Sequence, residues 1–345
     1  MAYGTVSADV IQSSVSGVSL GAGNSSIMKN RIINGAMVID QRNAGAAITP
    51  TSSPTYTLDR WNFFFSQASK FSVQQNAGSV TPPVGFKNYL GFTSTSAYSV
   101  LTGDYFIIGQ AIEGYNIADL GWGTSDAKTV TIAFQVYSSL TGTFGGALEN
   151  GDGSRCYPFS YSVPVANTWT TVSVTVAGDT TGTWLSTNGA GLIVRWGLGC
   201  GSTFGSGTAG AWSSTRSFQP TGTVSVVGTN GAKFYITGVQ LEVGTSATGY
   251  EYRQYGQELA LCQRYYEFGN TGFRQYAING SNGVCSQSFQ VNKRAAPTVT
   301  PTNNGGLGAP STGSTTNQYF LATLTQSGAS GTIDMFFTWT ASAEL

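Results

Sequence analysis

Apolar residues alternate with polar ones along many short segments of this chain, and this period of two constrains the fold more than any other feature. In TVTIAFQV, the residues Val130, Ile132, Phe134 and Val136 occupy every second position. Successive side chains of a strand point to opposite faces, so the alternation predicts strands with one buried face. The same pattern is found in RWNFFFSQ, KFSVQQN, YPFSYSVPV, TTVSVTVAG, GLIVRWGLG and FYITGVQLEVG.

Clusters of Gly, Asn, Asp and Ser separate these segments, and Pro164 is expected to mark a strand end or an edge. Strands that follow one another without intervening helices predict an all-β fold. We expect residues 31–255 to form an antiparallel jelly-roll β-sandwich. Residues 1–30 are small, polar and poor in large apolar side chains, so they cannot enclose a core. They are expected to form an extended N-terminal arm for docking or oligomerisation.

The C-terminal part of the chain has a different composition. From about residue 270, a tract rich in Gly, Asn, Thr and Pro leads to two further alternating segments, YFLATLTQ and GTIDMFFTWTASAEL. In the second of these, Ile333, Met335, Phe337 and Trp339 share one face. We therefore expect residues 270–345 to form a small C-terminal β module.

One segment, RQYGQELALCQRYYE, has helical spacing and holds four charged residues in a chain that is only 9% charged. Glu258 lies in its first turn and Arg264 in its last, which suits the helix dipole, and Gly269 is placed to follow the helix end. Leu259, Cys262 and Tyr266 share one face. A helix of about ten residues is marginal alone in water. The sequence thus predicts a docked, connecting helix within residues 256–269.

Charge excludes several classes of partner. The chain carries 16 basic and 16 acidic residues and no histidine, so its net charge is zero. No bulk field exists to hold a phosphate backbone, and we expect no nucleic-acid partner. No run of 18 apolar residues occurs, and the start MAYGTVSADV lacks the features of a secretory signal. We expect synthesis in a cytoplasm, without a signal peptide and without membrane insertion.

The sequence contains few patterns typical of metal binding or of reactive cysteines. The four cysteines, Cys156, Cys200, Cys262 and Cys285, have no CxxC spacing and no histidine beside them, so reduced, packed thiols are expected. Asp59 is expected to pair with Arg60 or Arg42. The alternative is a structural Ca²⁺ held by Asp40 or Asp59, although no calcium-loop motif supports it. We predict no metal site and no cofactor.

Catalysis is not expected either. Without histidine, a Ser-His-Asp or Cys-His arrangement is impossible. A glycosidase needs only two suitably spaced carboxylates, but nothing in the sequence singles out a pair. The acids that could supply one are Asp104, Glu113, Asp119, Asp126, Glu149 and Asp152. We predict a protein that is not an enzyme and has no catalytic residues.

Sugar binding requires no catalytic residues. Flat aromatic rings can stack on pyranose faces while amides and carboxylates bind the hydroxyls. Four aromatic residues lie in Gly- and Ser-rich, turn-like contexts, and they are our glycan-binding candidates: Tyr98, Tyr115, Trp122 and Trp212. The alternative for each ring is packing across the mouth of the sandwich or against a neighbouring copy.

Three stretches carry a resemblance to a known family. NRIINGAMVIDQRNAG, then YTLDRWNF, then FYITGVQLEVGTSATGYEYRQYGQELALCQRYYE resemble the pattern of bacteriophage tail-fibre and related virion surface proteins, including those of marine and cyanobacterial phages. The resemblance spans roughly residues 28–268, and the ending FFTWTASAEL is also similar. It implies a jelly-roll domain similar to carbohydrate-binding modules, carried on a virion and usually trimeric.

Two functions remain open. In the first, the chain is a receptor-binding tail fibre whose arm docks on other virion proteins and whose body attaches to host surface polysaccharide. In the second, it is a capsid decoration (cement) protein that stabilises the shell and binds no host ligand. Both are structural, non-enzymatic homotrimers located on the virion, and the resemblance favours the fibre.

Overall fold

The computed structural model describes residues 10–12, 19–21, 29–306, 309–326 and 329–345. The predicted arm, 1–30, lies outside the described residues except for Lys29, Asn30 and a hairpin of β1 (Val10–Gln12) with β2 (Ser19–Gly21). The chain divides into two compact units, Met1–Tyr252 and Arg253–Leu345.

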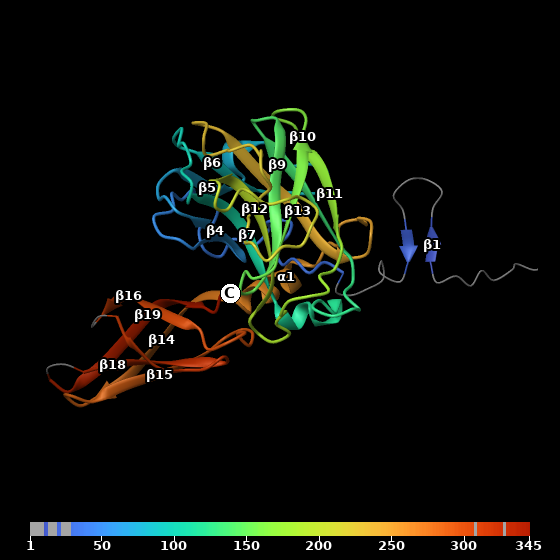
Figure 1. The fold of residues 1–345 in the computed structure, drawn as a ribbon. Coiled ribbons are helices and arrows are strands. Elements are labelled where there is room, and N and C mark those ends of the chain that lie inside the picture. Colours follow the sequence, from blue (N-terminus) through green and yellow to red (C-terminus); the bar gives the residue numbers. More distant parts are fainter. Residues whose placement is uncertain (1–9, 13–18, 22–28, 307–308, 327–328) are drawn as a thin grey trace, which may run out of the picture. The chain divides into compact units, whose positions relative to one another are not determined.

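The N-terminal unit is an antiparallel jelly-roll β-sandwich, which confirms the predicted fold class (Figure 1). One sheet has six strands in the order β10-β9-β12-β7-β4-β3, and the other has five in the order β11-β8-β13-β6-β5. The six strands are β10 (Cys156–Val163), β9 (Gly142–Asn150), β12 (Ala190–Cys200), β7 (Tyr105–Glu113), β4 (Trp61–Phe65) and β3 (Thr55–Leu58). The five are β11 (Thr170–Val176), β8 (Val130–Ser138), β13 (Lys233–Val243), β6 (Leu90–Ser94) and β5 (Phe71–Gln75).

The alternating residues form the core between the two sheets. Ile132, Phe134 and Val136 of β8 are at most 1% exposed. The ring centroid of Phe134 lies 5.4 Å from that of Trp196 on the facing sheet, and Trp196 lies 5.7 Å from Trp61. The prediction of strands with one buried face is confirmed for β5 and β11, but it was wrong for β12 and β13, which are buried on both faces. β10 ends at Val163, directly before Pro164.

The strands β7 and β9 have no such alternation, because the outer face of their sheet is also covered. Eight of the nine β7 residues are buried. The segment 201–231, between β12 and β13, covers this face: Phe204 and Phe218 pack on Tyr105 with centroid distances of 5.3 and 5.7 Å. The described residues of this unit also form three short 3-10 helices: η2 (Ala77–Ser79), η3 (Gly114–Asn116) and η4 (Ala118–Leu120).

The NGAMVIDQR stretch packs against the sandwich through a buried amide. The Nδ2 of Asn34 donates to the carbonyls of Ile39 (2.8 Å) and Asp59 (3.0 Å), while its Oδ1 accepts from the Ile39 N–H. The indole N–H of Trp61 donates to the Asn34 carbonyl at 3.0 Å. The motif is therefore bonded to the β3–β4 turn and to β4 of the six-stranded sheet.

The C-terminal unit is a smaller pair of three-stranded antiparallel sheets. One has the order β14-β19-β16 and the other β15-β18-β17. Their strands are β14 (Tyr266–Ala277), β19 (Gly331–Ser342), β16 (Thr298–Gly306), β15 (Asn282–Ser288), β18 (Tyr319–Thr325) and β17 (Ser311–Thr315). The four residues predicted to share a face in β19 are at most 3% exposed, and they pack with Phe320 in this unit's core.

The helix α1 (Tyr255–Gln263) belongs to the C-terminal unit and is shorter than predicted. It buries Glu258 and Cys262 and ends at Gln263, whose carbonyl accepts a 2.5 Å hydrogen bond from Lys293. The expectation that Gly269 follows the helix end was wrong. Gly269 lies within β14, opposite Trp339, where a Cβ would sit 2.7 Å from the indole. The contact between Gly269 and the Trp339 ring favours the strand conformation at this position. Local helix-end patterns in the sequence carry no information about such a long-range contact.

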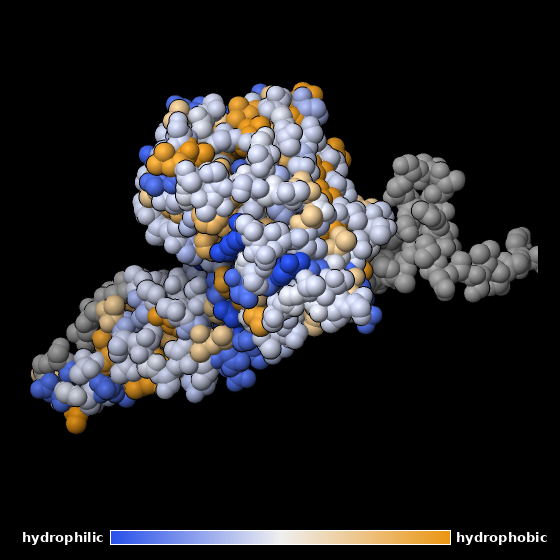
Figure 2. Space-filling view, in the orientation of Figure 1, coloured by the Kyte–Doolittle hydropathy of each residue, from blue (hydrophilic) through white to orange (hydrophobic). Residues whose placement is uncertain are grey.

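The four cysteines are free, with Cys156 and Cys262 buried. Among the described residues, no helix is both long and apolar enough to span a membrane. Figure 2 shows that most of the visible surface has intermediate hydropathy, as expected for a chain with few charged residues.

Candidate functional site

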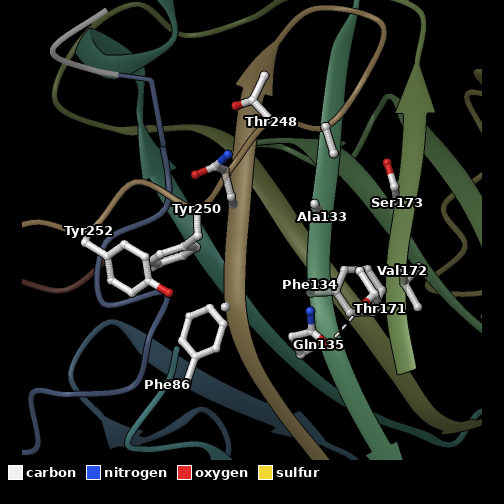
Figure 3. Close-up of a pocket in the computed structure, with 13 residues that line it drawn as sticks. Phe86, Ala133, Phe134, Gln135, Thr171, Val172, Ser173, Thr248, Tyr250 and Tyr252 are labelled. Carbon is white, nitrogen blue, oxygen red and sulfur yellow. Dashed lines mark hydrogen bonds between the residues drawn. The ribbon is translucent and has the colours of Figure 1, made fainter. Parts of the chain in front are cut away.

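The outer face of the five-stranded sheet carries a groove with a volume of about 280 Å³ (Figure 3). Its floor is formed by the residues that alternate with the core positions of two neighbouring strands. On β8 these are Ala133 and Gln135, and on β11 they are Thr171 and Ser173. The period of two that builds the core therefore also places small and polar side chains along the groove.

A bulge in β13 shapes the middle of the groove. The pairing of β13 with β8 shifts register between Thr237 and Gln240, and Gly238 within this bulge has φ 62°. This left-handed conformation favours glycine. The ring of Phe86 lies directly over Gly238, where a Cβ would be 2.6 Å from the ring Cζ. The bulge thus lets an aromatic ring lie close against the backbone at the edge of the groove.

Three aromatic rings form one wall. The centroid of Tyr250 lies 5.0 Å from those of Phe86 and Tyr252, and Phe86 lies 5.9 Å from Tyr252. Tyr252 is 62% exposed. Figure 3 shows the three rings together on one side of β13, with Gln135 and Thr171 on the other side. We call Phe86, Tyr250 and Tyr252 the aromatic wall.

The polar groups opposite the wall are held by hydrogen bonds. Thr171 Oγ1 donates to Gln135 Oε1 at 3.0 Å. Within the described part of the chain, the Gln135 Nε2 makes no hydrogen bond, so its two N–H donors are available to a ligand.

The end of the groove is built on the buried carboxylate of Glu242. It accepts from the hydroxyl of Thr248 at 2.6 Å and from the Gln240 amide at 2.8 Å. These contacts fix the side chains of Gln240 and Thr248, which both line the groove. No charged side chain lines it among the described residues. The site can therefore hold an uncharged ligand with one apolar face and several hydroxyl groups.

Two of the predicted glycan-binding residues, Tyr98 and Tyr115, lie apart from the other two. The Tyr98 hydroxyl donates to Asp104 at 2.7 Å, which raises the pKa of Tyr98, and its ring packs 5.7 Å from Phe106. Tyr115 belongs to η3 and is 61% exposed. Neither residue lines the groove.

The other two come together with a third indole that the sequence analysis did not single out. Trp122 lies 4.7 Å from Trp184 and 5.4 Å from Trp212 between ring centroids. Trp122 is 6% exposed and its indole N–H donates to the Lys128 carbonyl, so it packs inside the fold. Trp212 remains partly exposed, but it too lies outside the groove.

The groove residues were missed for a simple reason. Thr171 and Ser173 resemble any solvent-facing strand positions, and the aromatic wall joins Phe86 to a segment far along the sequence. The only available signal was the cluster YEY at 250–252, which follows the alternating segment FYITGVQLEVG after the short stretch TSATG.

Several acids considered for catalysis have structural partners. Burial would raise the pKa of Asp104, but hydrogen bonds from Tyr98, the Leu101 N–H and Ser66 hold it below its ordinary value. Glu149 is fully buried and paired with Arg195 and Arg216, and Asp119 pairs with Arg31 at 2.7 Å.

The acids weighed as calcium ligands also accept hydrogen bonds from the chain. Asp40 accepts from the N–H groups of Asn43 and Gly45, and Asp59 accepts from the backbone and side chain of Gln41. Among the described residues, no group of three or more Cys, Asp or Glu side chains is placed to hold a metal ion.

Comparison with protein-family models found no match, and comparison with curated proteins found none either. Solved structures similar to this chain include a domain of tailspike protein 4 from bacteriophage CBA120, at 10% identity and a TM-score of 0.34, covering 62% of this chain. This chain spans only 21% of that protein's chain.

Two further similar structures are smaller. A putative sugar binding protein from Bacteroides thetaiotaomicron is 12% identical, with a TM-score of 0.36, 63% of this chain covered and 100% of that one. TmCBM61, solved with β-1,4-galactotriose, is 10% identical, with a TM-score of 0.28, 53% of this chain covered and 88% of that one.

Proposed function

We propose that the N-terminal unit is a non-enzymatic glycan-binding module and that the groove on its five-stranded sheet is the binding site. The observation that carries this proposal is the aromatic wall facing an uncharged floor of amide and hydroxyl groups. A sugar ring has an apolar face of C–H groups and a rim of hydroxyls, and the groove offers a partner for each.

The geometry favours binding without large rearrangement. Gln135, Thr171 and Ser173 are on paired strands, and the β11–β8 ladder runs from Thr170 to Val176 without a register shift. Side chains on regular strands are held more precisely than side chains on loops. A ligand entering the groove therefore meets groups that are already in place, which reduces the entropic cost of binding.

The charges around the groove favour a neutral glycan. Glu242 supports one end of the groove through Thr248 and Gln240, and the Glu251 N–H donates to Gln240. Among the described residues, no cation lines the groove to balance an acidic sugar. A uronate or sulfated sugar would bring its negative charge near the carboxylate of Glu242, with little solvent between them. The repulsion between the two charges would disfavour binding.

The wider role rests on the sequence resemblance. We propose that the chain is a tail fibre or other receptor-binding protein of a phage virion, attached to other virion proteins through its N-terminal arm and assembled as a homotrimer. Native mass spectrometry of the full chain should show an oligomer of three copies. Quantified bands from purified virions should show a few tens of chains. Hundreds of copies would instead support a capsid decoration protein.

The binding proposal is tested with two matched tyrosines. The full chain is applied to an array of neutral and acidic oligosaccharides that includes β-1,4-galactotriose, a mixed-linked β-1,3-1,4 tetrasaccharide and xylohexaose. Tyr252→Ala should weaken binding of the best neutral glycan by about tenfold, because a stacking ring is lost. Tyr115→Ala, at 61% exposure against 62% for Tyr252, should leave it unchanged.

Thermal melts of both variants control for folding. Binding of the wild-type chain to acidic glycans only, with no neutral glycan bound, would contradict the proposal. So would a loss of binding in Tyr115→Ala with none in Tyr252→Ala.

A further inference from the structure

A second hollow lies at the β10 edge of the six-stranded sheet, where it is lined by an indole and hydroxyl groups. It has a volume of about 420 Å³ over the edge strand β10, and no charged residue lines it among the described residues. We call it the Trp212 cleft. The residues important here are Pro158, Ser206, Thr208, Trp212, Ser213 and Thr215.

The cleft and the groove share no lining residue. Pro158 alternates with Tyr157 and Phe159, which point into the core, so Pro158 faces outward from the six-stranded sheet. Gln135 faces outward from the five-stranded sheet by the same alternation. Trp212 lies at the edge of the sandwich, where its indole N–H donates to the carbonyl of Ala177, the residue after β11, so the cleft and the groove are separate sites of one unit.

The loop that forms the cleft is held to β10 by backbone hydrogen bonds. Cys156 and Ser213 exchange N–H to carbonyl bonds of 2.9 and 2.8 Å, and the Gly210 N–H donates to the Pro158 carbonyl at 2.9 Å. Gly207 approaches so closely that a Cβ there would lie 2.5 Å from Pro158 Cγ. The walls of the cleft are thus part of the folded scaffold.

Trp212 is fixed in one orientation. Its indole N–H donates to the Ala177 carbonyl at 2.8 Å, and its ring lies 5.2 to 5.5 Å from those of Tyr157, Trp122 and Trp184. Because the N–H is used inside the protein, the ring can offer a ligand only its apolar surface. A ring held in this way loses little conformational freedom on binding.

The rim of the cleft supplies free hydroxyl groups. Ser206, Thr208 and Thr215 are exposed, and within the described residues their side-chain hydroxyls make no hydrogen bond. Each can both donate and accept. One immobilised aromatic surface beside several uncommitted hydroxyls matches a neutral sugar and offers nothing to balance a charged ligand.

We infer that the Trp212 cleft is a second site for a neutral glycan, independent of the groove. With two separate sites, one chain can contact two glycan strands at once, and binding to a dense polysaccharide surface gains from this second contact.

The test uses three single arginine substitutions of exposed, short side chains in the full chain. Thr171→Arg fills the groove, Thr208→Arg fills the cleft, and Ser214→Arg is the matched control, because Ser214 is exposed and lines neither site. The probe is the neutral oligosaccharide that binds best on the array described above, titrated by calorimetry. Wild type and Ser214→Arg should bind two molecules per chain. Each of the other variants should bind one, and the Thr171→Arg/Thr208→Arg double variant none.

A second readout observes the cleft directly. The protein is labelled with 5-fluorotryptophan, and the ¹⁹F signal of Trp212 is assigned as the one that disappears in Trp212→Phe. When the oligosaccharide is titrated in, this signal should shift in Thr171→Arg, whose cleft is intact. It should not shift in Thr208→Arg, whose cleft is filled.

The outcomes separate the two sites. One molecule per chain, lost in Thr171→Arg and insensitive to Thr208→Arg, would overturn the cleft and leave the groove standing. Binding lost only in Thr208→Arg would support the cleft and overturn the groove. No binding of any neutral glycan by wild type would overturn both.

Discussion

Thr171 donates a 3.0 Å hydrogen bond from its hydroxyl to Gln135 Oε1, its direct partner across the β11–β8 ladder. The bond uses the carbonyl oxygen of the amide and leaves the two N–H donors of a groove-lining residue without a partner among the described residues. Gln135→Glu keeps the size and the acceptor but loses both donors and adds a negative charge. Neutral-glycan affinity should fall by about tenfold, the value of one or two hydrogen bonds to a ligand.

Calorimetry of Gln135→Glu against Ser162→Ala checks this expectation, since Ser162 is exposed on β10, away from the groove. Equal affinities for the two variants would show that Gln135 does not contact the ligand.

Trp122 should behave as a packing residue. It is buried against Trp184, and its indole N–H is satisfied by the Lys128 carbonyl. Trp122→Ala should lower the free energy of unfolding by about 3–5 kcal/mol, as expected for removal of a buried aromatic ring. Urea denaturation measures this, with Tyr115→Ala expected within about 0.5 kcal/mol of wild type. A fully stable Trp122→Ala that has lost glycan binding would instead identify Trp122 as a ligand platform.

Alternation made part of this fold predictable. The core positions of β11 could be assigned from the sequence because only one face of that strand is buried, and on β8 the outward-facing Ala133 and Gln135 stay partly exposed. β7 and β9 could not, because the segment 201–231 covers their outer face and removes the polar half of the pattern. A strand buried on both faces has no alternation of apolar and polar residues, so its sequence pattern cannot be told from that of other apolar segments.

The sites were less predictable than the core. The groove depends on a bulge at Gly238 and on Phe86 reaching that bulge from a distant loop, neither of which has a periodic signal. Trp212 could be named as an aromatic in a Gly- and Ser-rich loop, but its cleft depends on how that loop bonds to β10. Local sequence gives the residue types, and long-range pairing decides which of them meet.

Glu149 holds two arginines on the covered face of the six-stranded sheet. It is 0% exposed, and its partner Arg195 is 3% exposed. Burial lowers the pKa of Arg195, while the carboxylate favours its charged form. Glu149→Gln would leave a buried guanidinium without a counter-charge, so we expect a loss of about 3–5 kcal/mol in unfolding free energy.

The exposed pair Arg274 and Asp334 is the comparison, with side chains 71% and 46% accessible. Asp334→Asn should change stability little, because solvent screens this pair. Urea midpoints that fall equally in Glu149→Gln and Asp334→Asn would rule out burial as the cause.

Gly35 is required by close backbone approach. A Cβ at this position would lie 2.1 Å from the Val239 carbonyl oxygen, and the Gly35 carbonyl accepts from the Val239 N–H at 3.0 Å. Gly35→Ala should therefore separate the NGAMVIDQR stretch from β13 and lower the thermal midpoint by several degrees. Gly103→Ala is the control, since a Cβ added there would meet no described atom within 4 Å. Equal midpoints for the two variants would contradict the assigned role.

The thiols of Cys156 and Cys200 should make stability fall in alkali. Burial raises the pKa of Cys156 to about 11 and that of Cys200 to about 12. Unfolded thiols lose their protons near pH 8.5, so above that pH the folded chain binds more protons than the unfolded chain. This contribution is complete below about pH 8.5 and is lost as the pH rises toward 11 and 12.

Urea midpoints measured from pH 7 to 11 should decline, and Cys156→Ala/Cys200→Ala should decline less steeply than wild type. The buried tyrosine Tyr161, whose pKa is also raised by burial, contributes in the same direction and is unchanged in this variant. Identical slopes for the two proteins would show that the thiols titrate alike in the folded and unfolded chains.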